Sequence, residues 1–120
     1  MSFLKNHKEE IDTLFIMLQE HVKEKFGEEV KSIDEIKVKS RKRHLVYFRR
    51  ALMIILGEAF LKNYNQNEIA GVVGLDRTSF IHHFKGHMND YSVVKNYKKE
   101  YDLIRDTYLE KIGVEWKDTN

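Results

Sequence analysis

Three histidines lie close together in the second half of the chain, and their spacing raises the question of a metal site. His83 and His87 are four residues apart, which on an α-helix would place both imidazoles on one face. No glutamate follows His83 as in the His-Glu-x-x-His pattern of hydrolytic zinc sites, and Gly86 is expected to end the helix before His87. We therefore expect no metal site, and assign His82 to hydrogen bonding and His83 to packing.

The chain also lacks the residue patterns of common catalytic sites. It has no cysteine, which excludes thiolate catalysis, disulfides and cysteine-based metal sites. It has no Gly-x-x-x-x-Gly-Lys-Ser/Thr phosphate loop, and no His-apolar-His triplet of the kind that rolling-circle nucleases use with a tyrosine. We expect a protein that is not an enzyme and that needs no cofactor.

The strongest chemical signal is a concentration of positive charge. Residues 37–50, hereafter the basic segment, contain seven lysines or arginines and no acid; without them the chain has 14 basic and 19 acidic residues. Cations placed on phosphates release counterions, so such a segment is typical of a polyanion-binding surface. A merely solvated helix start is the alternative, and the absence of acids for i,i+4 pairing disfavours it. The seven are Lys37, Lys39, Arg41, Lys42, Arg43, Arg49 and Arg50.

A second polar cluster begins a short predicted helix. Asp76 is a favoured N-cap residue, and Arg77, Thr78 and Ser79 follow it ahead of the apolar Phe80. Arginine can bind O6 and N7 of guanine together, and threonine can offer its methyl group to thymine. Serine and free backbone N–H groups at a helix start suit phosphate. Purely structural roles, such as N-capping by Asp76, stay open.

The elements that must position these residues are helical. The chain has 120 residues, 42% of them hydrophobic, with no proline and six glycines, so we expect one all-α domain of about six helices. Apolar residues recur every three or four positions over residues 5–26, 45–61 and 92–113. Capping boxes at Ser32 and Asn65 predict two short helices, and Asp76 starts another that Gly86 is expected to end.

Ala70, Gly74 and Phe80 have the spacing of a helix-turn-helix. A small residue lies where two helices approach, a glycine follows in the turn, and an apolar anchor comes six residues later. An ordinary helical hairpin is the alternative. The polar start of the second helix and the nearby basic segment favour the DNA-binding interpretation.

Together these stretches resemble the C-terminal DNA-binding domain of the bacterial replication initiator DnaA. The matching residues are Ser40-Arg41-Lys42-Arg43-His44-Leu45, then Asn67-Glu68-Ile69-Ala70, then Asp76-Arg77-Thr78-Ser79-Phe80-Ile81-His82. The resemblance implies a basic loop and a helix-turn-helix related to that of the Trp repressor. It also implies an N-terminal amphipathic helix at 1–27 in the place of the family's linker helix, the DNA-binding domain at 28–113, and a tail at 114–120.

The resemblance further implies which residues contact DNA. It places Asp76, Thr78, Ser79 and His82 in the major groove, puts Arg77 in place of a base-reading histidine, and puts Arg41 in a loop that reaches the minor groove. The family's double glycine before the signature is reduced to Gly74, its Leu-Pro is replaced, and its ATPase module is absent. With the basic segment added, the residues expected at DNA are Arg41, Lys42, Arg43, Arg49, Asp76, Arg77, Thr78, Ser79, His82 and Lys85.

The sequence therefore predicts sequence-specific binding of double-stranded DNA, with residues 76–85 in the major groove and a role in replication initiation or transcription regulation. The alternative is a protein-interaction or dimerisation module that uses the N-terminal amphipathic helix, whose apolar stripe could instead fold onto the core. The longest apolar run, residues 51–56, is far shorter than a membrane span. We expect a cytoplasmic, nucleoid-associated protein with no membrane partner.

Overall fold

The fold is built from helices alone. The computed structural model describes residues 3–37 and 40–113, so Lys39 and the tail predicted at 114–120 lie outside the described residues. The described part contains seven α-helices, one short 3-10 helix and no strand, which confirms the predicted all-α single domain. None of these described helices has both the length and the hydrophobicity needed to cross a membrane.

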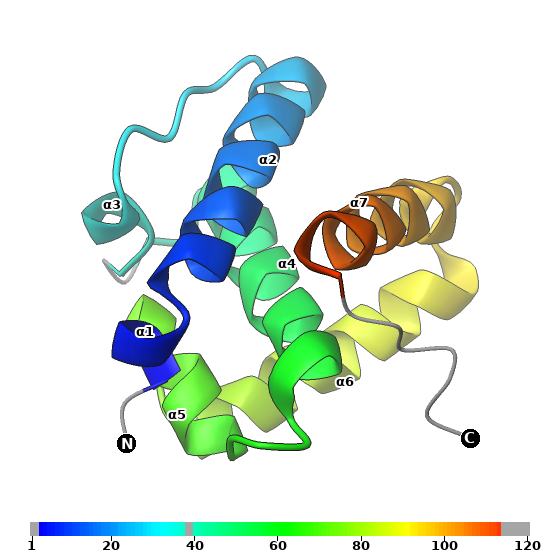
Figure 1. The fold of residues 1–120 in the computed structure, drawn as a ribbon. Helices are drawn as coiled ribbons and strands as arrows, with labels where there is room; N and C mark the ends of the chain where they lie inside the picture. Colours follow the sequence, from blue (N-terminus) through cyan, green and yellow to red (C-terminus); the bar gives the residue numbers. More distant parts are fainter. Residues whose placement is uncertain (1–2, 38–39, 114–120) are drawn as a thin grey trace.

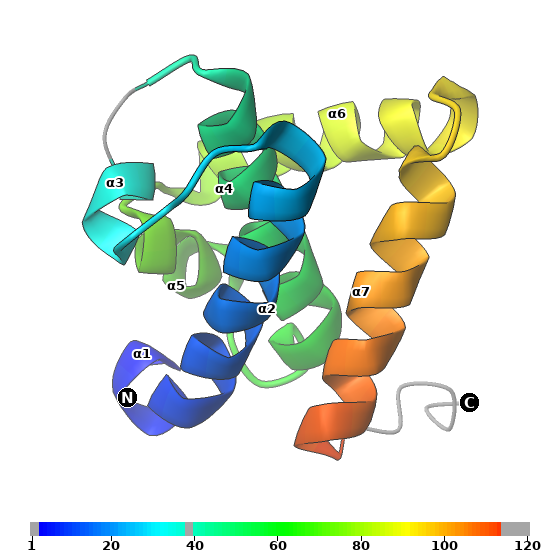
Figure 2. The same ribbon diagram turned by 90° about the horizontal axis from the view of Figure 1, so that it is seen from above.

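One long helix, α4, runs through the middle of the molecule. Figure 1 shows it surrounded by the other helices, and it contacts α2, α3, α5, η1, α6 and α7. Figure 2 shows α6 and α7 meeting at one corner, with α1 and α3 on the opposite side. The elements are α1 (Phe3–Asn6), α2 (Lys8–Phe26), α3 (Ile33–Lys37), α4 (Arg43–Phe60), α5 (Gln66–Ala70), η1 (Gly71–Val73), α6 (Arg77–Val93) and α7 (Tyr97–Ile112).

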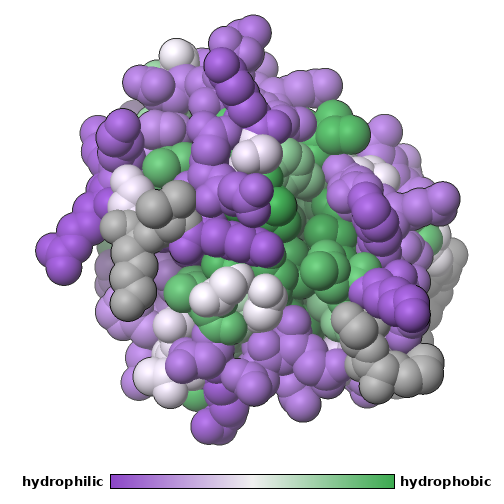
Figure 3. Space-filling model, turned by 90° about the vertical axis from the view of Figure 1, so that its left-hand side faces the viewer, coloured by the Kyte–Doolittle hydropathy of each residue, from purple (hydrophilic) through white to green (hydrophobic). Residues whose placement is uncertain are grey.

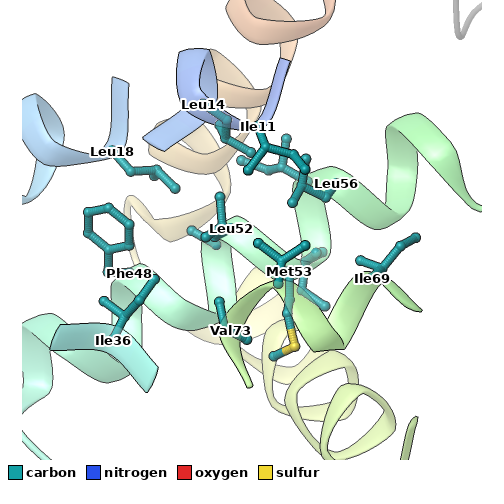
Figure 4. Close-up of a cluster of buried hydrophobic side chains, with 14 of the residues drawn as sticks. Ile11, Leu14, Leu18, Ile36, Phe48, Leu52, Met53, Leu56, Ile69 and Val73 are labelled. Carbon is teal, nitrogen blue, oxygen red and sulfur yellow. The ribbon is translucent and has the colours of Figure 1, made fainter. Parts of the chain in front are cut away.

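The hydrophobic core gathers around the buried side of α4. Figure 4 shows side chains from α2, α3, α5 and η1 meeting those of α4, including Leu52 and Met53. Both of these side chains are fully buried, as are Ile36 from α3 and Ile69 from α5. Each buried aliphatic side chain of this size contributes about 1.5–3 kcal/mol relative to its exposed state, so the core holds the helix-turn-helix and α2 to the same central helix.

The apolar stripe of α2 faces this core. It packs against α4 and α7, and the Tyr108 hydroxyl of α7 donates a hydrogen bond to the Glu10 carbonyl oxygen at 2.9 Å. The sequence leaves open whether this stripe binds a partner or packs on the protein's own core. In the structure it packs on the core. The buried stripe residues are Ile11, Leu14, Leu18 and Val22.

The prediction that Gly86 ends the fifth helix is wrong, because α6 continues through it to Val93. Gly86 lies where the Arg50 side chain of α4 crosses α6. A Cβ atom at this position would lie 2.6 Å from Nη2 of Arg50, which is too close for any real contact. The absence of a side chain at Gly86 leaves room for Arg50 of α4 beside α6. The packing of α4 against α6 thus outweighs the weak helix propensity of glycine, and α6 continues through it.

The predicted final helix also begins later than expected, at Tyr97 and not near Ser92. Ser92 belongs to the last turn of α6, and Val94 is extended. Asn96 then adopts a left-handed conformation with φ of 71°. Asparagine tolerates this region better than most residues, so it allows the chain to reverse from α6 into α7.

A second glycine fixes the distance between α4 and α6. Phe80 of α6 is only 3% exposed, and its ring lies against Gly57 of α4. A Cβ atom on Gly57 would lie 2.9 Å from Cζ of the ring. The apolar anchor that the sequence assigned to the helix-turn-helix therefore packs directly on the backbone of the central helix.

Gly57→Ala should lower the free energy of unfolding by about 1–3 kcal/mol, because the buried Phe80 ring must shift to admit the new methyl group. Gly71→Ala is the matched control, since its Cβ atom would meet nothing within 4 Å and its φ is −59°. The control should be neutral or stabilising by up to about 1 kcal/mol. Urea unfolding of both variants checks this, and equal effects would contradict the close contact.

Candidate nucleic-acid interface

The helix-turn-helix consists of α5, the short η1 and α6. Ala70 at the end of α5 is fully buried, and its carbonyl oxygen accepts a hydrogen bond from the N–H of Leu75 at 3.0 Å. Gly74 has φ of 74°, so the turn uses the left-handed conformation that glycine adopts without strain. Asn65 caps α5 in a capping box with Glu68, as the sequence predicts.

Two side chains hold the first turn of α6. Oδ1 of Asp76 accepts from the N–H of Ser79 at 3.0 Å, and Oδ1 of Asn67 in α5 accepts from the N–H of Arg77 at 3.0 Å. The bond to Ser79 lowers the pKa of Asp76 below its usual value. The backbone N–H groups of Arg77 and Ser79 are therefore engaged, contrary to the expectation that they are free for phosphate.

Most of the residues expected at DNA lie on the surface. Ser79 is half-buried and Arg49 is buried. The helical repeat places Thr78, His82 and Lys85 on one outward line of α6, opposite the buried Phe80. The eight exposed residues are Arg41, Lys42, Arg43, Asp76, Arg77, Thr78, His82 and Lys85.

Arg49 differs from its prediction as a DNA contact, because only 7% of its surface is exposed. Its Nε donates to the carbonyl oxygen of Ile36 at 2.7 Å, and burial lowers the pKa of its guanidinium. The side chain therefore links α4 to α3 and helps to place the end of α3 beside the basic segment. Its periodic position among the buried residues of α4 is the signal that sequence reasoning overlooked.

Arg50 is also engaged, so the alternative of a merely solvated cation does not apply to it. Its Nη1 lies 3.0 Å from Oδ2 of Asp90, and its Nε donates to Nδ1 of His83 at 3.4 Å. Both partners belong to α6. Arg50 thus joins the first half of α4 to α6 in the place that Gly86 leaves open.

The start of α6 and the start of the basic segment share a hollow on the surface, which we name the Thr78 hollow. It has a volume of about 360 Å³, and Thr78, Ser79 and His82 of α6 line it together with Lys37 from the end of α3. The sequence assigns Lys37 to the basic segment but not to the DNA-contacting set. In the structure it lines the hollow with four residues of that set, Arg49, Thr78, Ser79 and His82.

Arg41 and Arg43 line a neighbouring hollow of the same volume, about 360 Å³, which we name the Tyr47 hollow. Arg50 also lines it, and the contact between Arg50 and His83 connects it to the Thr78 hollow, which His83 lines. The Arg50–His83 contact therefore joins side chains that line the two hollows.

Arg77 lies on the other flank of α6. Residues on a helix step by 100°, so Arg77 and Ser79 lie on opposite sides of the line that passes through Thr78. Ser79 lines the Thr78 hollow together with Lys37, whereas Arg77 is exposed and does not line it. The two sets of side chains would therefore reach different parts of a ligand that lies along α6.

Figure 3 views the molecule from the side that carries α1 and α3. Hydrophilic side chains cover most of this side, and hydrophobic side chains reach the surface near its middle.

Among the described residues, no group of three His, Cys, Asp or Glu side chains lies close enough to hold a metal ion. His83 and His87 do share the continuous α6, but His87 is buried and hydrogen-bonds Oη of Tyr97 at 2.8 Å.

The chain matches no protein-family model, and no significantly similar curated protein or solved structure is found. The resemblance to the DnaA domain stays a prediction, and function is inferred from the residues of this surface.

Acid should destabilise the protein through His83 and His87. Burial first, and then the nearby Arg50, lower the pKa of both imidazoles to about 4 from 6.5. The unfolded chain therefore binds protons that the folded chain does not, so the stability present above pH 6.5 is lost as the pH falls toward 4.

Urea unfolding at pH 7 and pH 4.5 measures this loss. His87→Gln removes one of the two titrating groups and should reduce the difference in unfolding free energy between the two pH values. A variant that keeps the full wild-type difference would show that His87 does not titrate as its burial indicates.

Proposed function

We propose that this protein binds double-stranded DNA in a sequence-specific manner, with α6 in the major groove and the basic segment on the adjacent backbone or minor groove. The role is in replication initiation or transcription regulation, which would associate the protein with the nucleoid. The proposal involves no catalytic step. The proposal depends on the residues of this protein's own surface. The resemblance to the DnaA domain points to the same residues.

The observation that carries the proposal is the Thr78 hollow. In it, polar side chains on the outward face of a helix-turn-helix lie beside a cation of the basic segment. The major groove of B-DNA is about 12 Å wide and accepts an α-helix, while its flanking phosphates attract lysine and arginine. A surface that offers both kinds of group side by side has the composition that DNA recognition requires.

The distribution of charge supports the same conclusion. Arg49 is buried and Arg50 is paired with Asp90, so the exposed positive charge of the basic segment lies before α4 and at its first residue. Lys37, Arg41, Lys42 and Arg43 are exposed there. Lys37 lines the Thr78 hollow, and Arg41 and Arg43 line the Tyr47 hollow, where they can neutralise phosphates beside a groove-bound α6.

Arg77→Ala should relax the preference for one base pair of the bound site at a cost of about 1–3 kcal/mol, because arginine reads guanine through two paired hydrogen bonds. Selection of bound duplexes from a random pool gives the site and its symmetry, and the variant is then compared on single-base changes. Lys111→Ala, exposed on α7, is the control that should leave the preference unchanged. Absence of any enriched sequence for the wild-type protein would contradict specific recognition.

The double variant Arg41→Ala/Arg43→Ala should weaken binding to all duplexes and make its salt dependence shallower. Each phosphate contact contributes about 0.9 to the slope of log K against log salt, so the slope should fall by about 2. Lys99→Ala/Lys111→Ala removes two exposed charges from α7 and serves as the matched control. Equal slopes for both double variants would remove these arginines from the interface.

A further inference from the structure

We propose that the Tyr47 hollow is a binding site for a nucleoside phosphate. The site goes beyond DNA recognition and does not depend on it, because its occupancy can be measured with no DNA present. It lies where α2, α4, the end of α6 and the start of α7 meet. Its ligand class follows from the aromatic rings of its wall, the cations around it and its size.

The wall of the hollow contains Phe26, Tyr47 and Tyr97. The ring centroids of Tyr47 and Tyr97 are 6.3 Å apart at 79°, and Phe26 lies 5.4 Å from Tyr47. Both tyrosine hydroxyls are engaged away from a ligand, with His21 and His87 respectively, each at 2.8 Å. Lys25 of α2 lies over two of these rings, with its Nζ 5.7 Å from the ring centroids of Phe26 and of Tyr47. A nucleobase, which stacks well on aromatic rings, would take the place of this exposed lysine side chain.

Positive charge surrounds these rings. Arg41, Arg43 and Lys95 line the hollow, and none of the three forms an ion pair with another described residue. The other two cations of the lining are paired, Arg50 with Asp90 at 3.0 Å and Lys25 with Glu100 at 2.9 Å. Asp90 is the acid of the lining, and its charge is offset by Arg50. Three unpaired cations can thus bind a phosphate group.

The size of the site selects among aromatic anions. Its volume of about 360 Å³ is at the lower end of the range for small-molecule pockets, about 300–1,000 Å³, which suits one nucleotide. Inorganic phosphate would contact the cations alone, and a neutral aromatic molecule would contact the rings alone. A base joined to a phosphate through a sugar satisfies both.

The proposal has a functional consequence through Arg41 and Arg43. These side chains are also expected on the DNA backbone, so a nucleotide that occupies them should compete with duplex DNA. The same chemistry could come from a free nucleotide or from an unstacked nucleotide within a DNA strand. Binding of adenosine 5′-monophosphate and of a tetra-deoxyadenylate single strand to the full chain distinguishes the two sources, since the true source should bind more tightly.

Isothermal titration calorimetry with three probes tests the site. Adenosine 5′-monophosphate should bind at least tenfold more tightly than ribose 5-phosphate, which lacks the base, and than adenosine, which lacks the phosphate. If ribose 5-phosphate binds as tightly as the nucleotide, the rings take no part and the proposal is overturned. Absence of binding by both the nucleotide and the single strand also overturns it.

Lys95→Glu should weaken binding of adenosine 5′-monophosphate at least tenfold. Lys99→Glu is the matched control, because Lys99 is also exposed and does not line the hollow, and this variant should bind as the wild type does. Equal affinities for both variants would place the ligand elsewhere. Arg77→Ala should retain nucleotide binding even if it loses base preference on DNA, so failure of this site and failure of the proposed DNA recognition give different results.

Discussion

The crossing of α4 and α6 is the constraint on which the rest of the structure depends. Each helix contributes a glycine that receives a side chain from the other: Gly57 of α4 lies under Phe80, and Gly86 of α6 lies under Arg50. One contact is apolar and buried, and the other is polar and ends in an ion pair with Asp90. Together they fix both the distance of α6 from α4 and its rotation about its own axis, and this rotation turns Thr78 and His82 outward.

Much of the fold follows from sequence pattern, because helical periodicity and capping are local properties. The stripe of α2, the capping box at Asn65 and the N-cap at Asp76 all form as predicted. Local rules fail at Gly86, where a contact with Arg50 decides the outcome, and between α6 and α7, where one left-handed asparagine reverses the chain. The residues around Gly86 in the sequence do not indicate that Arg50 will contact it.

The candidate site shows the same division. Composition identifies the basic segment, and spacing identifies the start of α6, but neither says which cations point outward. Arg49 and Arg50 are adjacent in sequence and both turn toward other helices, one to a backbone carbonyl and one to a carboxylate. Lys37 and Lys95 are far apart in the sequence, and tertiary structure decides which hollow each of them lines.

The hydrogen bond from Tyr108 to the carbonyl oxygen of Glu10 joins two helices that are separated by almost the whole chain. α2 packs against α4 and α7, so its contacts with α7 cannot form until the residues near 108 have left the ribosome. Closing a loop of this length costs conformational entropy before the contact forms. The packing of α2 against α7 can therefore be completed only after α7 has been synthesised.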